Sequence, residues 1–306
     1  MMTFRKQIRN IVLNEDINFL LTNRIPRKAV THFMGWFSKL RVRWVSDSSI
    51  AVWRLFTDLD LSDAKKQQFD SLHDCFTREL RAGARVVDVR PEVFVSPSDA
   101  IVGECGQVIA GQVFQAKGFP YAMKDLLGSA VDASAWEDGC YVTLRLTSAM
   151  YHRFHAPYDA VIRKVVYMSG DTWNVNPIAL KRVEKLFCKN ERAMIALDVG
   201  AHRYPVALVP VAAILVASIR LHAIDTLFSA SYRGETTINC AHRVEKGQEL
   251  GWFEHGSTII VFAPRGFSLH PDIQSGARIR MGQALMNMPS DRVPNNVAVA
   301  QPSGVS

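Results

Sequence analysis

Two different spacings of hydrophobic residues divide the chain near residue 86. Before this point apolar residues recur at helical intervals, and after it they form short runs rich in β-branched residues, separated by glycine and proline. The clearest runs span residues 86–97, 101–114, 140–147, 160–170 and 191–199. Strands of this length with turns between them predict a compact, mainly antiparallel β domain. The expected fold class is therefore α+β, with a helical N-terminal region followed by that β domain.

The segment that begins at Arg27 predicts an amphipathic helix. Its apolar residues share one helical face, and they are Val30, Phe33, Met34, Phe37 and Leu40. Trp36 lies near the border, and the opposite face is polar: Arg27, Lys28, Thr31, Ser38 and Lys39. A basic amphipathic helix with aromatic residues on its apolar side fits a helix that lies in a membrane interface. The alternative is a helix that packs on its own domain and leaves its basic residues in water.

Three further segments carry weaker signals. Residues 14–23 predict a short helix or turn that ends before Pro26, and residues 46–73 predict a helical segment with Ser62 as its N-cap. The apolar stretch 204–221 is nearly long enough to span a membrane. Because it is rich in valine and contains Pro205 and Pro210, we expect one or two buried strands with a bend at Pro210 instead.

The charge of the chain is concentrated at its start. Residues 1–45 contain nine lysines and arginines against Glu15 and Asp16, a local excess equal to the net charge of +7 of the whole chain. A basic surface of this kind meets nucleic acid or anionic lipid. Since no nucleic-acid-binding motif accompanies the charge, we expect an anionic membrane and no nucleic acid. Five scattered cysteines without a CxxC pair, and a start without a signal peptide, indicate a reduced, intracellular compartment.

Gly256, Ser257 and Thr258 form the first candidate for chemistry. They come just before the β-branched run 258–261, so the serine is expected at a junction between a turn and a strand. A strained peptide bond held there could be attacked by the serine hydroxyl if a base lies nearby. Attack gives an ester, and elimination leaves a new N-terminus that ends as a pyruvoyl group, an electron sink made from the chain itself. Taken alone, such a tripeptide is far more often an ordinary turn before a strand.

A serine nucleophile needs a base, and the base needs an orienting carboxylate. The segment YHRFHAP supplies His152 and His155, which would point to different sides of an extended chain. The segment VSPSDA supplies Asp99, a residue that in such a place more often forms a turn. A histidine pair could also hold a metal, but the chain has no HExxH motif and no cysteine pair, so we expect no metal. Nucleotide-binding glycine loops and the GxSxG motif are also missing.

Seven fragments, in order from about residue 70 to residue 264, resemble the phosphatidylserine decarboxylase proenzyme family of pyruvoyl-dependent, membrane-associated enzymes. They are CFTRELRAGAR, VSPSDA, KGFPYAMKDLLG, YHRFHAP, WNVNPIA, LFCKNER and EKGQELGWFEHGST. The sequence departs from the family pattern at Ala100, Ala212 and Ala217, where the family usually has glycine. It also departs at His255, where leucine or glycine is common.

The resemblance implies a role for each matching residue. Asp99, His155 and Ser257 would be the self-cleavage triad, with His155 taking the proton of Ser257 and Asp99 orienting the imidazole. Cleavage between Gly256 and Ser257 would give a β chain of residues 1–256 and an α chain of residues 257–306 that begins with the pyruvoyl cofactor. His152 would act near the substrate during decarboxylation.

The resemblance also implies the activity, which is conversion of phosphatidylserine to phosphatidylethanolamine in phospholipid biosynthesis. We expect a peripheral protein on the cytoplasmic side of the cell membrane, and a homo-oligomer is a further option for its assembly. The expected organisation is a membrane-association region over 1–75, a catalytic domain over 76–288 and a flexible tail over 289–306. Two alternatives stay open, namely a pyruvoyl decarboxylase of a soluble amino acid and a lipid-binding pseudoenzyme that never cleaves.

Overall fold

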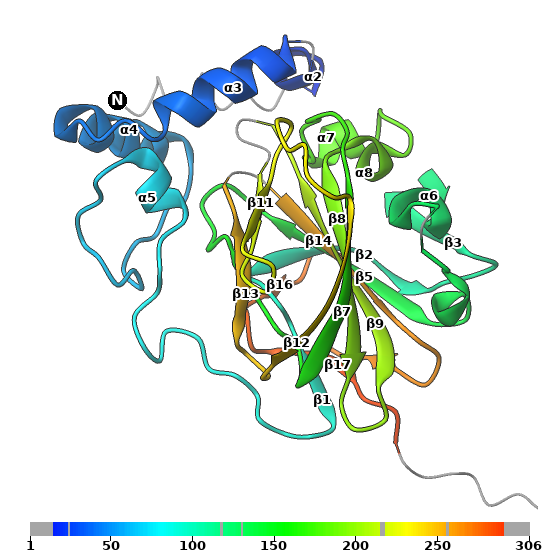
Figure 1. The fold of residues 1–306 in the computed structure, drawn as a ribbon. Helices are drawn as coiled ribbons and strands as arrows, with labels where there is room; N and C mark the ends of the chain where they lie inside the picture. Colours follow the sequence, from blue (N-terminus) through cyan, green and yellow to red (C-terminus); the bar gives the residue numbers. More distant parts are fainter. Residues whose placement is uncertain are drawn as a thin grey trace, which may run out of the picture.

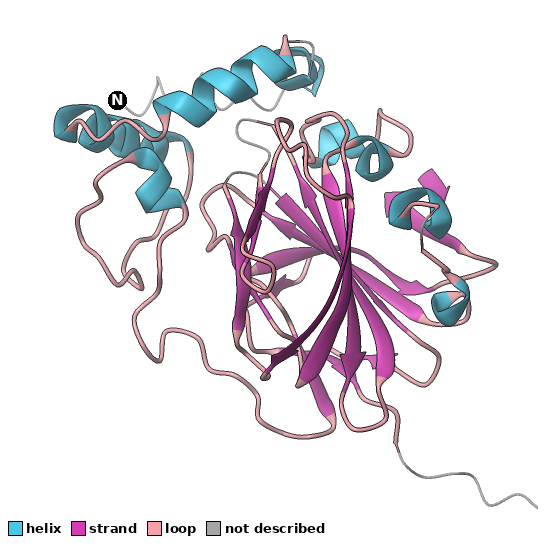
Figure 2. Ribbon diagram, in the orientation of Figure 1, coloured by secondary structure: helices cyan, strands magenta, loops and turns pink. Residues whose placement is uncertain are grey.

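A row of helices lies across one end of a β domain (Figures 1 and 2). The computed structural model describes residues 15–23, 25–116, 119–129, 131–214, 218–254 and 257–290. The row consists of α2 (Glu15–Asn23), α3 (Arg27–Phe37), α4 (Arg43–Phe56) and α5 (Leu72–Phe76). The predicted helix from Arg27 is therefore present. The predicted tail from residue 291 onward, and residues 1–14, lie outside the described residues.

Every strand of the β domain pairs in the antiparallel sense, which confirms the predicted sheet type. The largest sheet has the strand order β12-β7-β8-β9-β14-β5-β2-β16. Its strands are β2 (Ala100–Gln107), β5 (Cys140–Leu146), β7 (Ala160–Met168), β8 (Arg192–Val199), β9 (Tyr204–Ala212), β12 (Thr237–Val244), β14 (Ser257–Ala263) and β16 (Arg278–Ile279).

Smaller sheets and short helices cover the two faces of this large sheet. A four-stranded sheet has the order β11-β10-β13-β6, with β6 (Arg153–His155), β10 (Ile219–Leu221), β11 (Thr226–Phe228) and β13 (Glu249–Phe253). A three-stranded sheet contains β1 (Val93–Val95), β15 (Ser268–Leu269) and β17 (Ala284–Asn287). The remaining elements are the hairpin of β3 (Gln112–Ala116) and β4 (Phe119–Ala122), the helices α6 (Met123–Leu127), α7 (Pro177–Leu180) and α8 (Leu186–Lys189), and a 3-10 turn at Ser134–Trp136.

Strand β14 contributes to both hydrophobic cores of the domain. Ile259 and Val261 belong to the core shared with the four- and three-stranded sheets, whereas Ile260 and Phe262 belong to the core beneath α6, α7 and α8. All seven residues of the strand are buried. Because both faces are covered, a continuous apolar run is the sequence pattern that such a strand requires.

The apolar stretch 204–221 forms β9 and β10, as predicted. No helix of the described ranges is long and apolar enough to cross a membrane. Strand β9 does not end at Pro210, because that residue still pairs with Ile259 of β14. On its other side, the ladder with β8 lacks the pairs opposite residues 209 and 210, as expected for a residue without an N–H group.

The prediction of a helical segment over residues 46–73 is wrong for its second half. Helix α4 ends at Phe56, and Ser62 lies in a turn where its own N–H donates to Asp60 Oδ1 at 2.8 Å instead of capping a helix. Residues 57–71 fold back over α4, and their buried Leu59 and Phe69 pack in one cluster with Ile50. Burial of these side chains outweighs the weak helical propensity of the segment.

Helix α3 docks on the β domain through its polar face. Arg27 forms an ion pair with Asp171 at 2.6 Å, and its guanidinium lies 3.7 Å from the ring centre of Trp173. Thr31 is buried, and its hydroxyl lies 3.4 Å from that of Thr172. The helix therefore packs on its own domain, but with the polar face turned inward.

Candidate active site

Ser257 is the first residue of the central strand β14. Its Cα pairs with Leu146 of β5 and with Ala212 of β9, and its side chain has no exposed surface. The hydroxyl has no hydrogen-bond partner among the described residues. A buried hydroxyl without a partner costs free energy, about 1–3 kcal/mol, and the hydroxyls of Ser98, Thr143 and Thr258 are in the same state. His255 and Gly256, which precede it, lie outside the described residues.

Asp99 lies at the same end of the large sheet as Ser257. Arg145 of β5 pairs with Thr258 on one side and with Ile101 of β2 on the other, so Asp99 is two strands from Ser257 and just beyond the sheet end. Two strand spacings correspond to about 10 Å. The register of the sheet thus brings segments more than 150 residues apart in sequence to the same end of the sheet.

The carboxylate of Asp99 is held by a bidentate ion pair. Arg85 Nε donates to Oδ1 at 2.8 Å and Arg85 Nη2 to Oδ2 at 2.5 Å. The backbone N–H of Met281 also donates to Oδ1, at 2.9 Å. Both partners of the ion pair are largely buried, a situation in which a carboxylate needs a cation and several donors.

His155, at the end of β6, is held as a neutral base. Its Nδ1 lies 2.9 Å from the carbonyl oxygen of Gly247, which can only accept, so Nδ1 carries the proton. Nε2 is then the basic nitrogen, and the hydroxyl of Tyr151 donates to it at 3.1 Å. Burial lowers the pKa of His155, and the hydrogen bond to Gly247 opposes that effect only in part. The imidazole is therefore unprotonated at neutral pH.

The three predicted members of the triad lie in one region without direct hydrogen bonds between their side chains. The His155 N–H donates to the Pro97 carbonyl at 2.8 Å, which brings its segment beside the turn before Asp99. The Asp99 carboxylate, however, binds Arg85 and Met281, and the position next to His155 Nδ1 is taken by Gly247. Asp99 acts on the imidazole through its charge, which favours the protonated form.

His152 occupies a different setting from His155. It is fully buried, its Nδ1 lies 2.8 Å from the carbonyl oxygen of Met150, and its ring centre lies 4.0 Å from that of Phe76. The N–H of Phe253, four residues before Ser257, donates to the His152 carbonyl at 3.0 Å. This bond ties the backbone of His152 to the chain that leads into Ser257.

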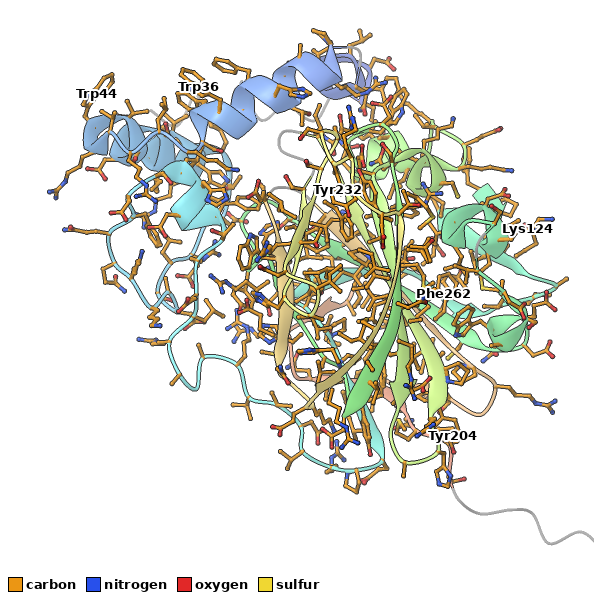
Figure 3. All side chains as sticks on the ribbon, in the orientation of Figure 1. Trp36, Trp44, Lys124, Tyr204, Tyr232 and Phe262 are labelled. Carbon is orange, nitrogen blue, oxygen red and sulfur yellow. The ribbon has the colours of Figure 1, made fainter. Side chains whose placement is uncertain are left out.

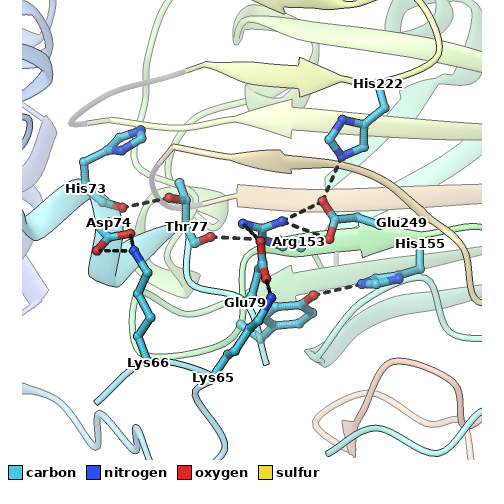
Figure 4. Close-up of polar contacts among 11 residues, drawn as sticks. Lys65, Lys66, His73, Asp74, Thr77, Glu79, Arg153, His155, His222 and Glu249 are labelled. Atoms are coloured by element: carbon cyan, nitrogen blue, oxygen red, sulfur yellow. Dashed lines mark hydrogen bonds and ion pairs between the residues drawn. The ribbon is translucent and has the colours of Figure 1, made fainter. Parts of the chain in front are cut away.

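Residues that the sequence patterns did not single out complete the surroundings. Arg153 joins the N-terminal region to the four-stranded sheet, since its guanidinium donates to the Thr77 carbonyl at 2.9 Å and to Glu249 at 2.9 and 3.0 Å (Figure 4). Tyr151 and Arg85 bind the predicted base and acid directly. Both lie inside fragments that carried the family resemblance, which was the available signal, but no spacing rule links them to their partners.

A serine at the head of a buried strand, an aspartate at the same end of that sheet and a histidine base beside the turn before the aspartate suit chemistry on the chain's own backbone. A sequence model of the phosphatidylserine decarboxylase family matches residues 72–287, and the chain belongs to that family. Among its relatives are the phosphatidylserine decarboxylase proenzymes of Yersinia pestis (strain Pestoides F) and Yersinia pseudotuberculosis serotype O:1b (strain IP 31758). Each is 31% identical over 288 residues, covering 89% of this chain and 96% of the relative.

Proposed function

We propose that this chain is a self-cleaving proenzyme that decarboxylates phosphatidylserine to phosphatidylethanolamine. The observation that carries the proposal is the buried Ser257 hydroxyl, which has no partner among the described residues and stands at the first position of the central strand. Membership in the family, whose relatives are named proenzymes, supports the same reading.

In the proposed maturation, Ser257 Oγ adds to the carbonyl carbon of residue 256, and the acyl group moves from nitrogen to oxygen to give an ester. Loss of the Ser257 Cα proton and rupture of the Cβ–O bond release the new carboxylate of residue 256. The dehydroalanine left behind takes up water and loses ammonia to become the pyruvoyl group. The new chains are residues 1–256 and 257–306.

His155 is the proposed base for the first step. It is neutral, and its proton is fixed on Nδ1 by Gly247, so Nε2 can accept the proton of the serine once Tyr151 yields its hydrogen bond. Asp99 would stabilise the imidazolium by charge. Its bidentate bond to Arg85 fixes that charge in position.

Decarboxylation in the mature enzyme relies on the pyruvoyl group, which supplies the electron sink for the electrons of the broken carbon–carboxylate bond. The chain's own part is to bind the substrate and to exclude water. His152 is proposed to act on the substrate, because it is fully buried and its backbone is tied to the chain that leads into Ser257.

The first test is the intact mass of the purified protein. Two chains, the smaller one starting at residue 257 without a free amine, are expected. A single chain at full mass would contradict self-cleavage and favour the pseudoenzyme. Turnover of phosphatidylserine but not of free serine by the cleaved protein would exclude the soluble amino acid decarboxylase.

A pair of histidine variants separates the two proposed roles. His155→Ala is expected to leave the chain uncleaved, whereas His152→Ala is expected to cleave normally and to decarboxylate poorly. Ser257→Ala is the uncleaved reference for both. If the two histidine variants exchange these outcomes, the base for maturation is His152 instead.

We further propose that the helices α3 and α4 bind the cytoplasmic surface of the membrane peripherally. The polar face of α3 packs against the β domain, so the aromatic side chains on its other face are exposed to solvent. Phe33 is 57% exposed, Trp36 61% and Trp44 73%. Both tryptophans point away from the β domain (Figure 3). Exposed aromatic rings next to basic residues suit the headgroup region of a leaflet rich in anionic lipid.

A further inference from the structure

Glu254 stands three residues before Ser257 and is buried, with 5% of its surface exposed. Three side chains bind its carboxylate. His73 Nε2 lies 2.9 Å from Oε1, whereas Lys39 Nζ at 3.2 Å and Ser218 Oγ at 3.1 Å bind Oε2. The N–H of Glu254 also donates to the carbonyl of Ser218, at 3.2 Å. Side chain and backbone are thus both fixed at the last described residue before the proposed cleavage bond.

The carboxylate is ionised in spite of its burial. Burial alone would raise its pKa, but the hydrogen bond and the charge of His73, together with Lys39, lower the pKa to about 2. A buried anion with several donors is strongly restricted in position, because loss of one partner leaves an uncompensated charge. This makes Glu254 a fixed point in the chain that leads into Ser257.

The partners of Glu254 come from the N-terminal region and from the β domain. Lys39 follows helix α3, and His73 lies in α5. Helix α5 is also joined to the end of α3, because the N–H of His73 donates to the carbonyl of Ser38 at 2.8 Å. Ser218 directly precedes β10. One carboxylate therefore connects the helices that carry the exposed aromatic residues to the loop between β13 and β14.

We propose that Glu254 is a positioning residue for maturation. Held by Lys39, His73 and Ser218, it fixes the chain before Ser257, so that self-cleavage depends on the docked N-terminal helices. The proposal rests on the proposed function, since it presupposes that the bond before Ser257 is cut. Its physical basis is the strict geometry of intramolecular attack, in which a shift of 1 Å can cost about a hundredfold in rate.

The test is the rate at which the newly synthesised 306-residue chain is converted into two chains, followed by intact mass. Glu254→Gln removes the charge but keeps the shape, and it is expected to slow cleavage about ten- to a hundredfold. Lys39→Met and His73→Asn should also slow cleavage. Lys39→Arg keeps the positive charge and should cleave at the rate of the unmodified protein. The matched control is Lys65→Met, because Lys65 forms a comparable ion pair with Glu79 at 2.6 Å in an exposed place.

A purely structural role would lower the melting temperature without changing the cleavage rate of the folded chains, so both are measured on every variant. Wild-type cleavage by folded Glu254→Gln would overturn the proposal. If that variant does not fold, Lys39→Met and His73→Asn decide, and wild-type rates in both would overturn it. Failure of the unmodified protein to cleave would instead contradict the proposed function itself.

Discussion

His155 illustrates how one buried side chain sets the pH range of a reaction. Burial lowers its pKa, so the imidazole stays neutral at pH values where an ordinary histidine, with a pKa of about 6.5, is half protonated. As the pH falls through the lowered pKa, the base becomes protonated and its function is lost. A lowered value therefore extends the active range toward acid.

We expect the rate of self-cleavage to be constant through neutral pH and to fall with a midpoint below about 6.5, the ordinary histidine value. The measurement is the fraction of cleaved chain against time, by intact mass, at a series of pH values. The folded state of uncleaved Ser257→Ala is checked at the same pH values. A midpoint at or above the ordinary value would contradict a buried, neutral base.

Glu254 has the opposite linkage to pH. Its pKa is lowered from 4.5 to about 2, so its contribution to stability is complete above the unfolded-state value and disappears as the pH falls toward the folded-state value. In a Ser257→Ala background, Glu254→Gln should lower the free energy of unfolding at pH 7, and the difference should shrink between about pH 4.5 and the acid limit of folding. A difference that stays constant over that range would contradict the ionised state of Glu254.

The sequence predicted the local setting of the site better than its contacts. The position of Ser257 at the start of a strand follows from the β-branched run after it, because that signal is contained in a few neighbouring residues. The partners of Asp99 and His155 could not be predicted in this way. Gly247 reaches His155 across 92 residues and Met281 reaches Asp99 across 182, and no periodicity encodes such pairings.

At the scale of elements, the four-stranded sheet depends on a glycine. A Cβ added to Gly251 in β13 would lie 1.9 Å from the carbonyl oxygen of Arg220 in β10. The oxygen is part of the backbone and the Cβ is bonded directly to it, so neither atom can move aside without shifting a strand. Only a glycine allows the two strands to pair at this point. The backbone tied to His152 belongs to the same strand β13, so its position depends on that pairing.

Gly251→Ala is expected to lower the free energy of unfolding by at least about 1–3 kcal/mol, the usual cost of overpacking. Gly103→Ala is the control, since its Cβ would meet Thr143 at 3.3 Å, mainly through a side chain. Denaturant unfolding of both, in a Ser257→Ala background that prevents cleavage, measures the difference. Equal stability of the two variants would show that β10 and β13 can separate without cost.

Elements were predictable where one face of them is buried and the pattern is regular. Helix α3 and strands β5, β7, β8, β9 and β14 fall into that group. Strand β12 was missed, because it is an edge strand whose side chains are mostly exposed and polar. Residues 57–71 misled the prediction for the opposite reason. Their apolar side chains are buried by tertiary packing that has no helical period.

At the scale of the whole molecule, the exposed aromatic residues of α3 allow a direct test of membrane binding. Phe33→Asn with Trp36→Asn should weaken binding to anionic phospholipid vesicles by about tenfold or more, because each large apolar side chain contributes about 1.5–3 kcal/mol when fully buried. Sedimentation with vesicles gives the binding constant. Self-cleavage in solution should not change.

The matched control is Ile109→Asn, since Ile109 is 68% exposed but lies in the turn between β2 and β3, far along the chain from the helices. It should bind vesicles like the unmodified protein. Equal loss of binding in the control and the double variant would mean that the helices do not form the membrane-binding surface.

The two products of cleavage should stay together as one folded body. The α chain would contain β14, which lies between β5 and β9. It would also contain β16 and β17, which pair with β2 and β1 of the β chain. We expect both chains to elute together in native buffer and to unfold in a single thermal transition. Separation of a 50-residue fragment without denaturant would contradict this arrangement.

The central place of β14 also imposes an order in time. The strand has to be laid between β5 and β9 before the bond in front of it is cut, because the sheet positions the serine and fills both cores. A pair of genes that encode residues 1–256 and 257–306 separately would therefore not yield a working enzyme by simple mixing. Cleavage can therefore take place only after folding. A cleaved chain is then evidence that the molecule had folded correctly.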